Sequence, residues 1–318
     1  MVMVVEIVSK EFIKPTPPTP HHLRTHLLSF LDQFLPSIYV PMVLFYMDQE
    51  KSIPAATSNS RRSQLLKESL SETLTLFYPL VGRINDHLSI DYNDEGAYYI
   101  DARVNHPLRE FLNHIDSSYV SQVFLAEGTW TATTAGGYIA MIQSHHLCMR
   151  WAALTRKCGE EAGSPNFDSS FVFPQSVAYL REATFSAIFS PFLKKEICRS
   201  MRIAFDASAT DLLKVKTTSS SVRDPTRVEV VSAVLCKCNM ATFKVKFGIQ
   251  KSTLITLWCN FGLYEIDFGW GKPTWVTCTA STKSEAVFMN TIVLIDTKME
   301  NGIEACVFLE EQYMVMLE

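Results

Sequence analysis

One stretch of this chain decides its fold class: Tyr264-Glu265-Ile266-Asp267-Phe268-Gly269-Trp270-Gly271-Lys272-Pro273. Two glycines flank a tryptophan, and because glycine adopts positive φ angles without strain, the backbone can turn tightly there. The indole can then pack against neighbours while the aspartate pairs with a nearby donor. We therefore interpret Asp267, Phe268, Gly269, Trp270 and Gly271 as a structural signature rather than a catalytic site.

Helix and strand patterns alternate along the chain, which predicts a mixed α/β fold. Residues 4–14 alternate like an edge strand and end at a run of prolines, which lack the amide donor that a strand needs. Apolar residues at helical spacing predict a helix that begins at residues 60–63 and ends before Pro79. Residues 227–247 contain neither proline nor glycine and predict a long helix.

Shorter segments complete the predicted fold. Residues 88–92 and 97–103 are strand-like and flank Asn93-Asp94-Glu95-Gly96, a turn that suits a hairpin. Gly82 follows a helix exit and is free to take a positive φ angle. Further strands are predicted at residues 138–143, 201–205, 274–280 and 287–296, and a short helix at residues 211–216.

Composition limits the classes of function. With 318 residues, of which 47% are hydrophobic and 19% charged, the chain can bury the cores of two ordinary domains. A net charge of −4 leaves no broad basic surface for nucleic acid. The N-terminus lacks the basic region of a signal peptide, and no stretch approaches the roughly 18 apolar residues that span a bilayer. We expect a cytoplasmic protein that binds neither nucleic acid nor membrane.

The eight cysteines are scattered, without the paired short spacings of a zinc site. We therefore expect reduced thiols and no metal. Cys236 and Cys238 either share one face of a strand or lie on a buried helix. Cys148 is interpreted as a buried structural thiol rather than a nucleophile.

The motifs of this chain stand in the order of a known family. Asp-Phe-Gly-Trp-Gly at residues 267–271 matches a signature of the plant BAHD acyltransferases without an error, and Phe77-Tyr78-Pro79-Leu80-Val81-Gly82-Arg83 also resembles that family. The likeness continues through residues 28–33, 93–96, 136–137, 202–207, 225–233 and 301–311. Within the family, the chain looks closest to the branch that forms alkaloid and terpenoid esters.

The resemblance implies both a fold and an activity. The fold is α/β, with two chloramphenicol-acetyltransferase-like domains that contain mixed sheets, at residues 1–175 and 176–318, the second domain being incomplete. The activity is the transfer of an acyl group from acyl-CoA to the hydroxyl or amine of a small plant metabolite. The expected acyl group is acetyl. Acyl-CoA is then a co-substrate rather than a covalently bound cofactor, and the protein is a monomer.

The catalytic signature of the family is His-x-x-x-Asp, and this chain carries Ser144-His145-His146-Leu147-Cys148-Met149-Arg150 in its place. The resemblance assigns His145 as the general base that takes the proton of the acceptor, with His146 in reserve. Met149 stands where the aspartate belongs if His145 is the base, and Arg150 if it is His146. The block whose arginine pairs with that aspartate in relatives is missing after Thr256.

Three functions stay open at this point. The first is an active acyltransferase, the second an inactive relative that binds a ligand or a partner, and the third the product of a decayed gene that folds poorly. No residue is assigned to coenzyme A. Lys237, Lys244, Lys246 and Lys251 either hold its phosphates or form a solvated helix face, and we favour the solvated face.

Overall fold

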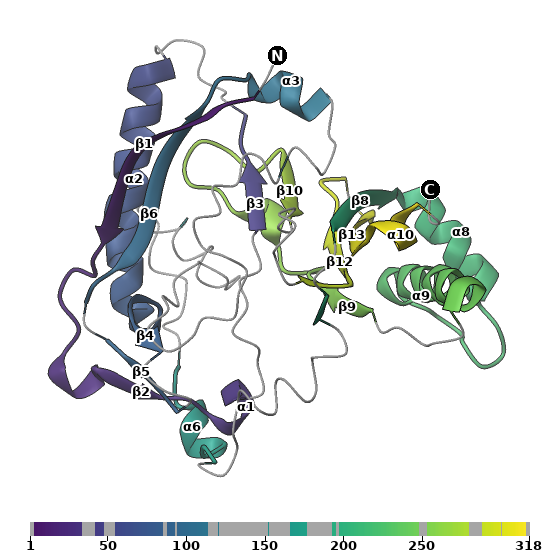
Figure 1. Cartoon of the computed structure of the whole chain (residues 1–318), viewed down its shortest axis with the longest axis horizontal. Coiled ribbons are helices and arrows are strands. Elements are labelled where there is room, and N and C mark those ends of the chain that lie inside the picture. Colours follow the sequence, from purple (N-terminus) through teal and green to yellow (C-terminus); the bar gives the residue numbers. More distant parts are fainter. Residues whose placement is uncertain are drawn as a thin grey trace.

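The computed structural model describes residues 3–33, 42–47, 55–84, 88–92, 94–113, 120, 152, 166–176, 193–194, 197–247, 253–279, 288–299 and 301–315, with the backbone alone at 55–59, 193–194, 241–247 and 288. Within these ranges the strands form five small sheets, and long helices lie beside two of them (Figure 1). The predicted mixed α/β fold is therefore confirmed. No helix in these ranges is long and apolar enough to cross a membrane.

The largest described sheet has four strands in the order β8 (Cys198–Phe205), β13 (Ile303–Glu310), β12 (Thr291–Asp296) and β9 (Leu254–Leu257). β13 is antiparallel to both of its neighbours, whereas β9 is parallel to β12, so the sheet is mixed as predicted. Every residue of β13 is buried because apolar clusters cover both faces of the sheet. β8 contains the predicted strand at residues 201–205.

Two helices lie side by side next to this sheet, α8 (Ala207–Thr217) and α9 (Arg227–Phe247) (Figure 1). α8 begins earlier than predicted because the side chain of Asp206 caps it, accepting the N–H of Ala209 at 2.7 Å. α9 has the predicted bounds. Its start is a capping box, in which Glu229 accepts the N–H of Thr226 at 2.7 Å and donates its own N–H to the Thr226 hydroxyl at 3.3 Å.

The N-terminal strand β1 (Val5–Ile13) pairs with β6 (Ala97–Val104), and α2 (Ala55–Leu76) packs against this pair (Figure 1). The edge strand predicted at residues 4–14 is confirmed, whereas α2 begins before the predicted start. The predicted hairpin is wrong, because β5 (Ser89–Asp91) pairs with β2 (Thr25–Leu27) and β4 (Arg83–Ile84) instead of β6. Asp94 and Gly96, at φ angles of 52° and 98°, redirect the chain between the two sheets.

Gly82 is required for space rather than for a positive φ angle. Its φ is −88°, an ordinary value, so the sequence-based expectation is wrong. A Cβ atom at this position would lie 2.4 Å from Cδ1 of Tyr92 and 2.5 Å from Cγ2 of Ile90. The glycine therefore lets the chain that leaves the 3-10 helix η2 (Tyr78–Val81) pass close to β5 and the tyrosine that follows it.

The predicted strand at residues 287–296 is divided into β11 (Phe288–Met289) and β12 by Asn290. This buried side chain accepts the N–H of Glu310 at 3.2 Å and so fixes the end of β13 instead of continuing one strand. The remaining short elements are η1 (His21–Leu23), α1 (Phe30–Gln33), α3 (Leu108–Asn113), α6 (Ser169–Val172), β7 (Leu193–Lys194), η3 (Leu263–Glu265) and α10 (Glu311–Met314).

One strand pair joins distant parts of the sequence. β10 (Trp275–Cys278), which belongs to the strand predicted at residues 274–280, is antiparallel to β3 (Met42–Phe45). Figure 1 shows this pair between the β1–β6 sheet and the four-stranded sheet. The signature turn at residues 267–271 leads directly into β10, so the turn and this junction are built from the same segment.

Candidate functional site

The signature turn is closed by the side chain of Asp267. Its Oδ1 atom accepts the N–H groups of Gly269 and Gly271 at 2.8 and 3.0 Å. Both glycines have positive φ angles, 105° and 102°, which side chains other than glycine rarely adopt. The sequence therefore specifies the turn twice, through the carboxylate and through the glycines.

The aromatic residues of the signature anchor the turn to the N-terminal half of the chain. Phe268 is buried, and its ring centroid lies 5.8 Å from that of Trp270. Arg62 of α2 places its guanidinium 5.5 Å from the Trp270 ring centroid, a cation–π distance. Tyr46, just after β3, contacts Phe268 edge-on and donates its hydroxyl to the carbonyl of Ile266 at 2.9 Å. The turn thus contacts both α2 and the end of β3.

A charged cluster around the buried carboxylate of Glu304 lies beyond the turn and also contains Arg202 and Trp275. The indole N–H of Trp275 donates to Glu304 at 3.2 Å, and Nε of Arg202 lies 2.6 Å from the same carboxylate. The guanidinium also covers the Trp275 ring at 5.2 Å, and Phe45 stacks on that ring with centroids 5.1 Å apart. The cluster therefore connects β8 and β13 to the β3–β10 pair.

Burial controls the electrostatics of this cluster. Glu304 has a side chain only 4% exposed, and this burial raises the pKa of its carboxyl, while Arg202 and the indole N–H act in the opposite direction. Burial also raises the pKa of the neighbouring Tyr264 to about 12, and its hydroxyl accepts the N–H of Val276 at 3.1 Å. The contacts of these groups run between strands, so the cluster holds β8, β10 and β13 together.

The described cysteines are not joined in disulfides: Cys198, Cys236, Cys238, Cys259, Cys278 and Cys306. Burial raises the pKa of both Cys198 and Cys259 to about 12. Neither buried thiol is therefore a thiolate nucleophile at neutral pH. Cys236 and Cys238 lie on α9 and are exposed, so the expectation of a strand or a buried helix is wrong for them. No group of metal-ligating side chains occurs within the described ranges.

The predicted catalytic residues cannot be placed. His145, His146, Cys148, Met149 and Arg150 lie outside the described residues, and so do residues 138–143, the strand expected to precede them. The roles of His145 and His146 therefore stay predictions. Lys237 is exposed on α9, as a solvated helix face requires, whereas the side chains of Lys244 and Lys246, and Lys251 altogether, fall outside the description.

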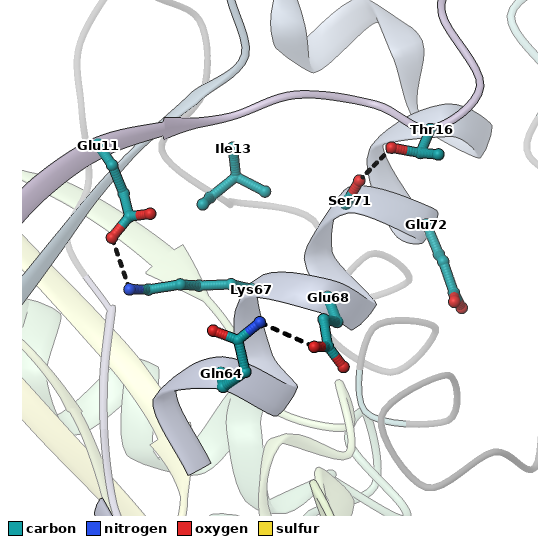
Figure 2. Close-up of a pocket in the computed structure, with 8 residues that line it drawn as sticks. All are labelled: Glu11, Ile13, Thr16, Gln64, Lys67, Glu68, Ser71 and Glu72. Atoms are coloured by element: carbon teal, nitrogen blue, oxygen red, sulfur yellow. Dashed lines mark hydrogen bonds and ion pairs between the residues drawn. The ribbon is translucent and has the colours of Figure 1, made fainter. Parts of the chain in front are cut away.

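The structure also shows a surface groove of about 390 Å³ between β1 and α2 (Figure 2). Lys67 reaches from α2 to Glu11 on β1, with 2.5 Å between Nζ and Oε1, and the hydroxyls of Thr16 and Ser71 lie 2.9 Å apart. The full lining is Glu11, Ile13, Thr16, Gln64, Lys67, Glu68, Ser71 and Glu72. No residue that the sequence analysis singled out lines this groove.

Sequence reasoning missed the Arg202–Trp275–Glu304 cluster. Arg202 lies in the strand predicted at residues 201–205 and Glu304 in the family-like stretch at residues 301–311, but neither was assigned a contact. A usable signal was nevertheless present, because Glu304 is a charged residue inside an otherwise apolar strand, Ile303 to Leu309. A buried carboxylate of this kind requires a partner, and an arginine on a neighbouring strand is the usual one.

A protein-family comparison gives a match to the Transferase family over residues 3–131 and 240–318, more than half of the chain. Among curated relatives, epi-neemfruitin B 7-O-acetyltransferase of Melia azedarach and limonoid 7-O-acetyltransferase of Citrus sinensis are each 40% identical to it. Each alignment covers 80% of this chain and 63% of the relative. Stemmadenine O-acetyltransferase of Catharanthus roseus is 32% identical, over 76% of this chain and 62% of that protein. The chain thus spans less than two thirds of the length of these relatives.

Solved structures share the fold at lower identity. Vinorine synthase has a TM-score of 0.74 and 24% identity, with 98% of this chain and 96% of that chain covered. A protein of F. graminearum complexed with coenzyme A and deoxynivalenol has a TM-score of 0.61 and 13% identity, with 92% and 96% covered. Both the sequence similarity to the curated relatives and the fold similarity to the solved structures extend over most of the chain.

Proposed function

The chain belongs to the BAHD acyltransferases of the Transferase family, and on this premise we propose that it transfers an acyl group from coenzyme A to a hydroxyl group of a small plant metabolite. The observation that carries the proposal is the 40% identity to two 7-O-acetyltransferases over 80% of this chain. Their names suggest acetyl-CoA as the donor and a limonoid-type alcohol as the acceptor. An amine could replace the hydroxyl as acceptor, because it would attack the thioester in the same way.

In the proposed reaction, His145 is the general base. It takes the proton of the acceptor hydroxyl as the oxygen attacks the thioester carbonyl, and the tetrahedral intermediate then collapses with release of the coenzyme A thiolate. The proton held by His145 passes to that thiolate, so no covalent acyl-enzyme is formed. A base of this kind contributes roughly 10²–10⁴-fold to the rate. His146 would take this role if its ring, rather than that of His145, faces the substrate.

The signature turn has a positioning role in this proposal. Residues 1–175 and 176–318 are proposed as the two domains, and the turn and β10 carry residues of the second against α2 and β3 of the first. A rigid junction would keep the donor and the acceptor aligned, which matters because a misplacement of about 1 Å can cost about 10²-fold in rate. The proposed place of the reaction is the cytosol.

A second candidate, a ligand-binding relative without turnover, rests on the motif itself. Met149 or Arg150 occupies the position of the motif aspartate, depending on which histidine is counted. An arginine side chain accepts no hydrogen bond and a methionine thioether is only a weak acceptor, so neither replaces the carboxylate of an aspartate. A loop left without that acid would present its histidine loosely, and binding would then persist while catalysis fails.

The test combines binding and turnover on the purified full chain. Acetyl-CoA binding is measured by isothermal titration calorimetry, and thiol release is measured with a panel of alcohols that includes limonoids. The variants are His145→Ala and His146→Ala, and the matched control is His22→Ala, which removes an exposed histidine at the start of the chain. We expect saturable binding in all four proteins, and thiol release that one of the two candidate variants abolishes and His22→Ala retains.

Each of the other possible results favours a different conclusion. Binding without thiol release in the wild type would favour the ligand-binding relative. Thiol release that survives in both His145→Ala and His146→Ala would reject histidine as the base while keeping acyl transfer. A folded protein that binds no acetyl-CoA would overturn acyl transfer, and an insoluble product would favour a decayed gene.

A further inference from the structure

The outer edge of β9 is an unpaired strand edge in the described part of the chain. β9 ends the four-stranded order and pairs on one side only, with β12. The N–H groups of Leu254 and Trp258 donate to the carbonyls of Asn290 and Leu294 at 2.9 and 2.8 Å. Because backbone polar groups alternate in direction along a strand, the N–H and C=O groups of Ile255 and Leu257 point to the opposite side, away from β12.

This edge lacks the features that usually prevent strands from associating. Residues 253–258, Thr-Leu-Ile-Thr-Leu-Trp, contain no charge, no proline and no glycine, and the pairing with β12 has no bulge. Leu254 and Leu257 are 40% and 46% exposed. Natural edge strands are normally interrupted by a lysine, a proline or a bulge, because a flat apolar edge recruits another strand. The β9 edge therefore favours a partner strand.

We propose that the partner is a second copy of this chain, which pairs β9 against β9 in the antiparallel direction and extends the sheet across a dimer. A twofold axis perpendicular to the sheet, midway between the Thr256 residues of the two copies, places Ile255 of each copy opposite Leu257 of the other. Each of these opposite pairs exchanges two N–H···O=C hydrogen bonds. The register thus uses all four outward-pointing residues, two from each copy.

The facing side chains suit this self-pairing. Both cross-strand pairs combine isoleucine with leucine, and no like charges oppose each other across the axis. Ile255 packs against the cluster that contains Val231 and Leu235 of α9, so the symmetry places both α9 helices on the same side of the joined sheet. An unrelated strand would need apolar residues at the two positions that face Ile255 and Leu257. Every copy of this chain already has them.

The size of the contact sets its strength. Only four residues of each copy belong to the pairing strand, so the contact is short compared with stable interfaces, which bury roughly 1,200–2,000 Å². The dimer is therefore weak and forms with rising protein concentration. This conclusion departs from the monomer expected from the sequence, and it does not depend on acyl transfer.

Sedimentation equilibrium of the full chain over a range of micromolar concentrations tests the proposal. Leu257→Lys introduces a charge at the edge, and since Leu257 is exposed, the fold should tolerate it. The matched control is Leu212→Lys, the same change at a 60% exposed position on α8. We expect the wild type and Leu212→Lys to dimerise alike, and Leu257→Lys to dissociate at least about tenfold more readily, because a charge is desolvated at the centre of the pair.

Leu257→Pro provides a second variant, since it removes the outward N–H while leaving the donors to β12 in place. Hydrogen exchange of residues 253–258 gives an independent readout, in which protection of the Ile255 and Leu257 amides should rise with concentration in the wild type and in Leu212→Lys. A wild type that stays monomeric throughout would overturn the proposal. So would a dimer that Leu257→Lys and Leu257→Pro, both shown to be folded by circular dichroism, leave unchanged.

Discussion

Two ion pairs of this molecule have nearly the same length but different surroundings. Arg202 lies 2.6 Å from Glu304, whose side chain is 4% exposed, whereas Lys67 lies 2.5 Å from Glu11 in the groove, whose side chain is 41% exposed. Burial raises the pKa of Glu304, while the hydrogen bond from Lys67 lowers the pKa of Glu11. The surroundings, rather than the distance, decide what each pair does for the fold.

The largest difference between the two pairs should appear when the buried carboxylate is removed. Glu304→Ala leaves both the indole N–H of Trp275 and the guanidinium of Arg202 without their acceptor. Because Arg202 is about a third exposed, we expect a loss of about 2–4 kcal/mol in the free energy of unfolding, somewhat below the cost of breaking a fully buried pair. Urea denaturation measures this loss.

The matched control for that change is Glu311→Ala. Glu311 pairs with Arg199, and both side chains are about half exposed, so its removal should cost less than about 1 kcal/mol. Equal losses for Glu304→Ala and Glu311→Ala would show that burial does not govern the strength of these pairs.

A smaller effect is expected in the signature turn, where a carboxylate accepts backbone N–H groups instead of pairing in the core. Asp267→Ala removes the acceptor of the Gly269 and Gly271 amides, and we expect about 1–3 kcal/mol of destabilisation. Thermal unfolding measures it, with Asp211→Ala on the exposed side of α8 as the control. An unchanged melting temperature would mean that the glycines alone specify the turn.

The same contrast explains how much of the fold the sequence predicts. α9 and the positive φ angles of Gly269 and Gly271 depend on local pattern, and local pattern predicted them. The hairpin failed because β6 pairs with β1, a partner more than eighty positions away that the turn at residues 93–96 does not encode. Local composition cannot weigh a distant partner strand against a near one.

In the candidate site, too, local contacts were predicted and contacts between distant strands were not. Composition predicted that Asp267 would find a donor, since the amides of Gly269 and Gly271 lie within the same short segment. The cluster around Glu304 joins β8, β10 and β13, and no local pattern specifies such a meeting. The base assigned to His145 rests on family resemblance alone and stays a prediction.

The pH dependence of stability should have opposite signs at the two carboxylates. Glu304, with a raised pKa, keeps its proton in the folded state at pH values where the unfolded chain has lost it. Its contribution to stability is therefore full below the unfolded pKa, about 4.3, and declines as the pH rises toward the folded pKa. Glu11, with a lowered pKa, contributes above the unfolded pKa and loses that contribution as the pH falls through the folded pKa.

The free energy of unfolding is measured for the wild type, Glu304→Gln and Glu11→Gln across acidic and neutral pH. The difference between the wild type and each variant gives the pH-dependent contribution of that carboxylate. We expect the first difference to fall with rising pH and the second to rise. Two differences with the same sign would contradict the assignment of burial as the cause at Glu304.

The smallest expected effect is that of Lys67→Met, which removes the ammonium from the groove while keeping a side chain of similar length. The contact between Lys67 and the Tyr99 ring, at 5.2 Å, is partly kept by the thioether, so the change mainly tests the charge pair with Glu11. A double-mutant cycle with Glu11→Gln should give a coupling of about 0.2–1 kcal/mol that shrinks as salt is added. A coupling above about 2 kcal/mol that resists salt would place this pair with Glu304 and Arg202, and the contrast between a buried and a solvated pair would then fail.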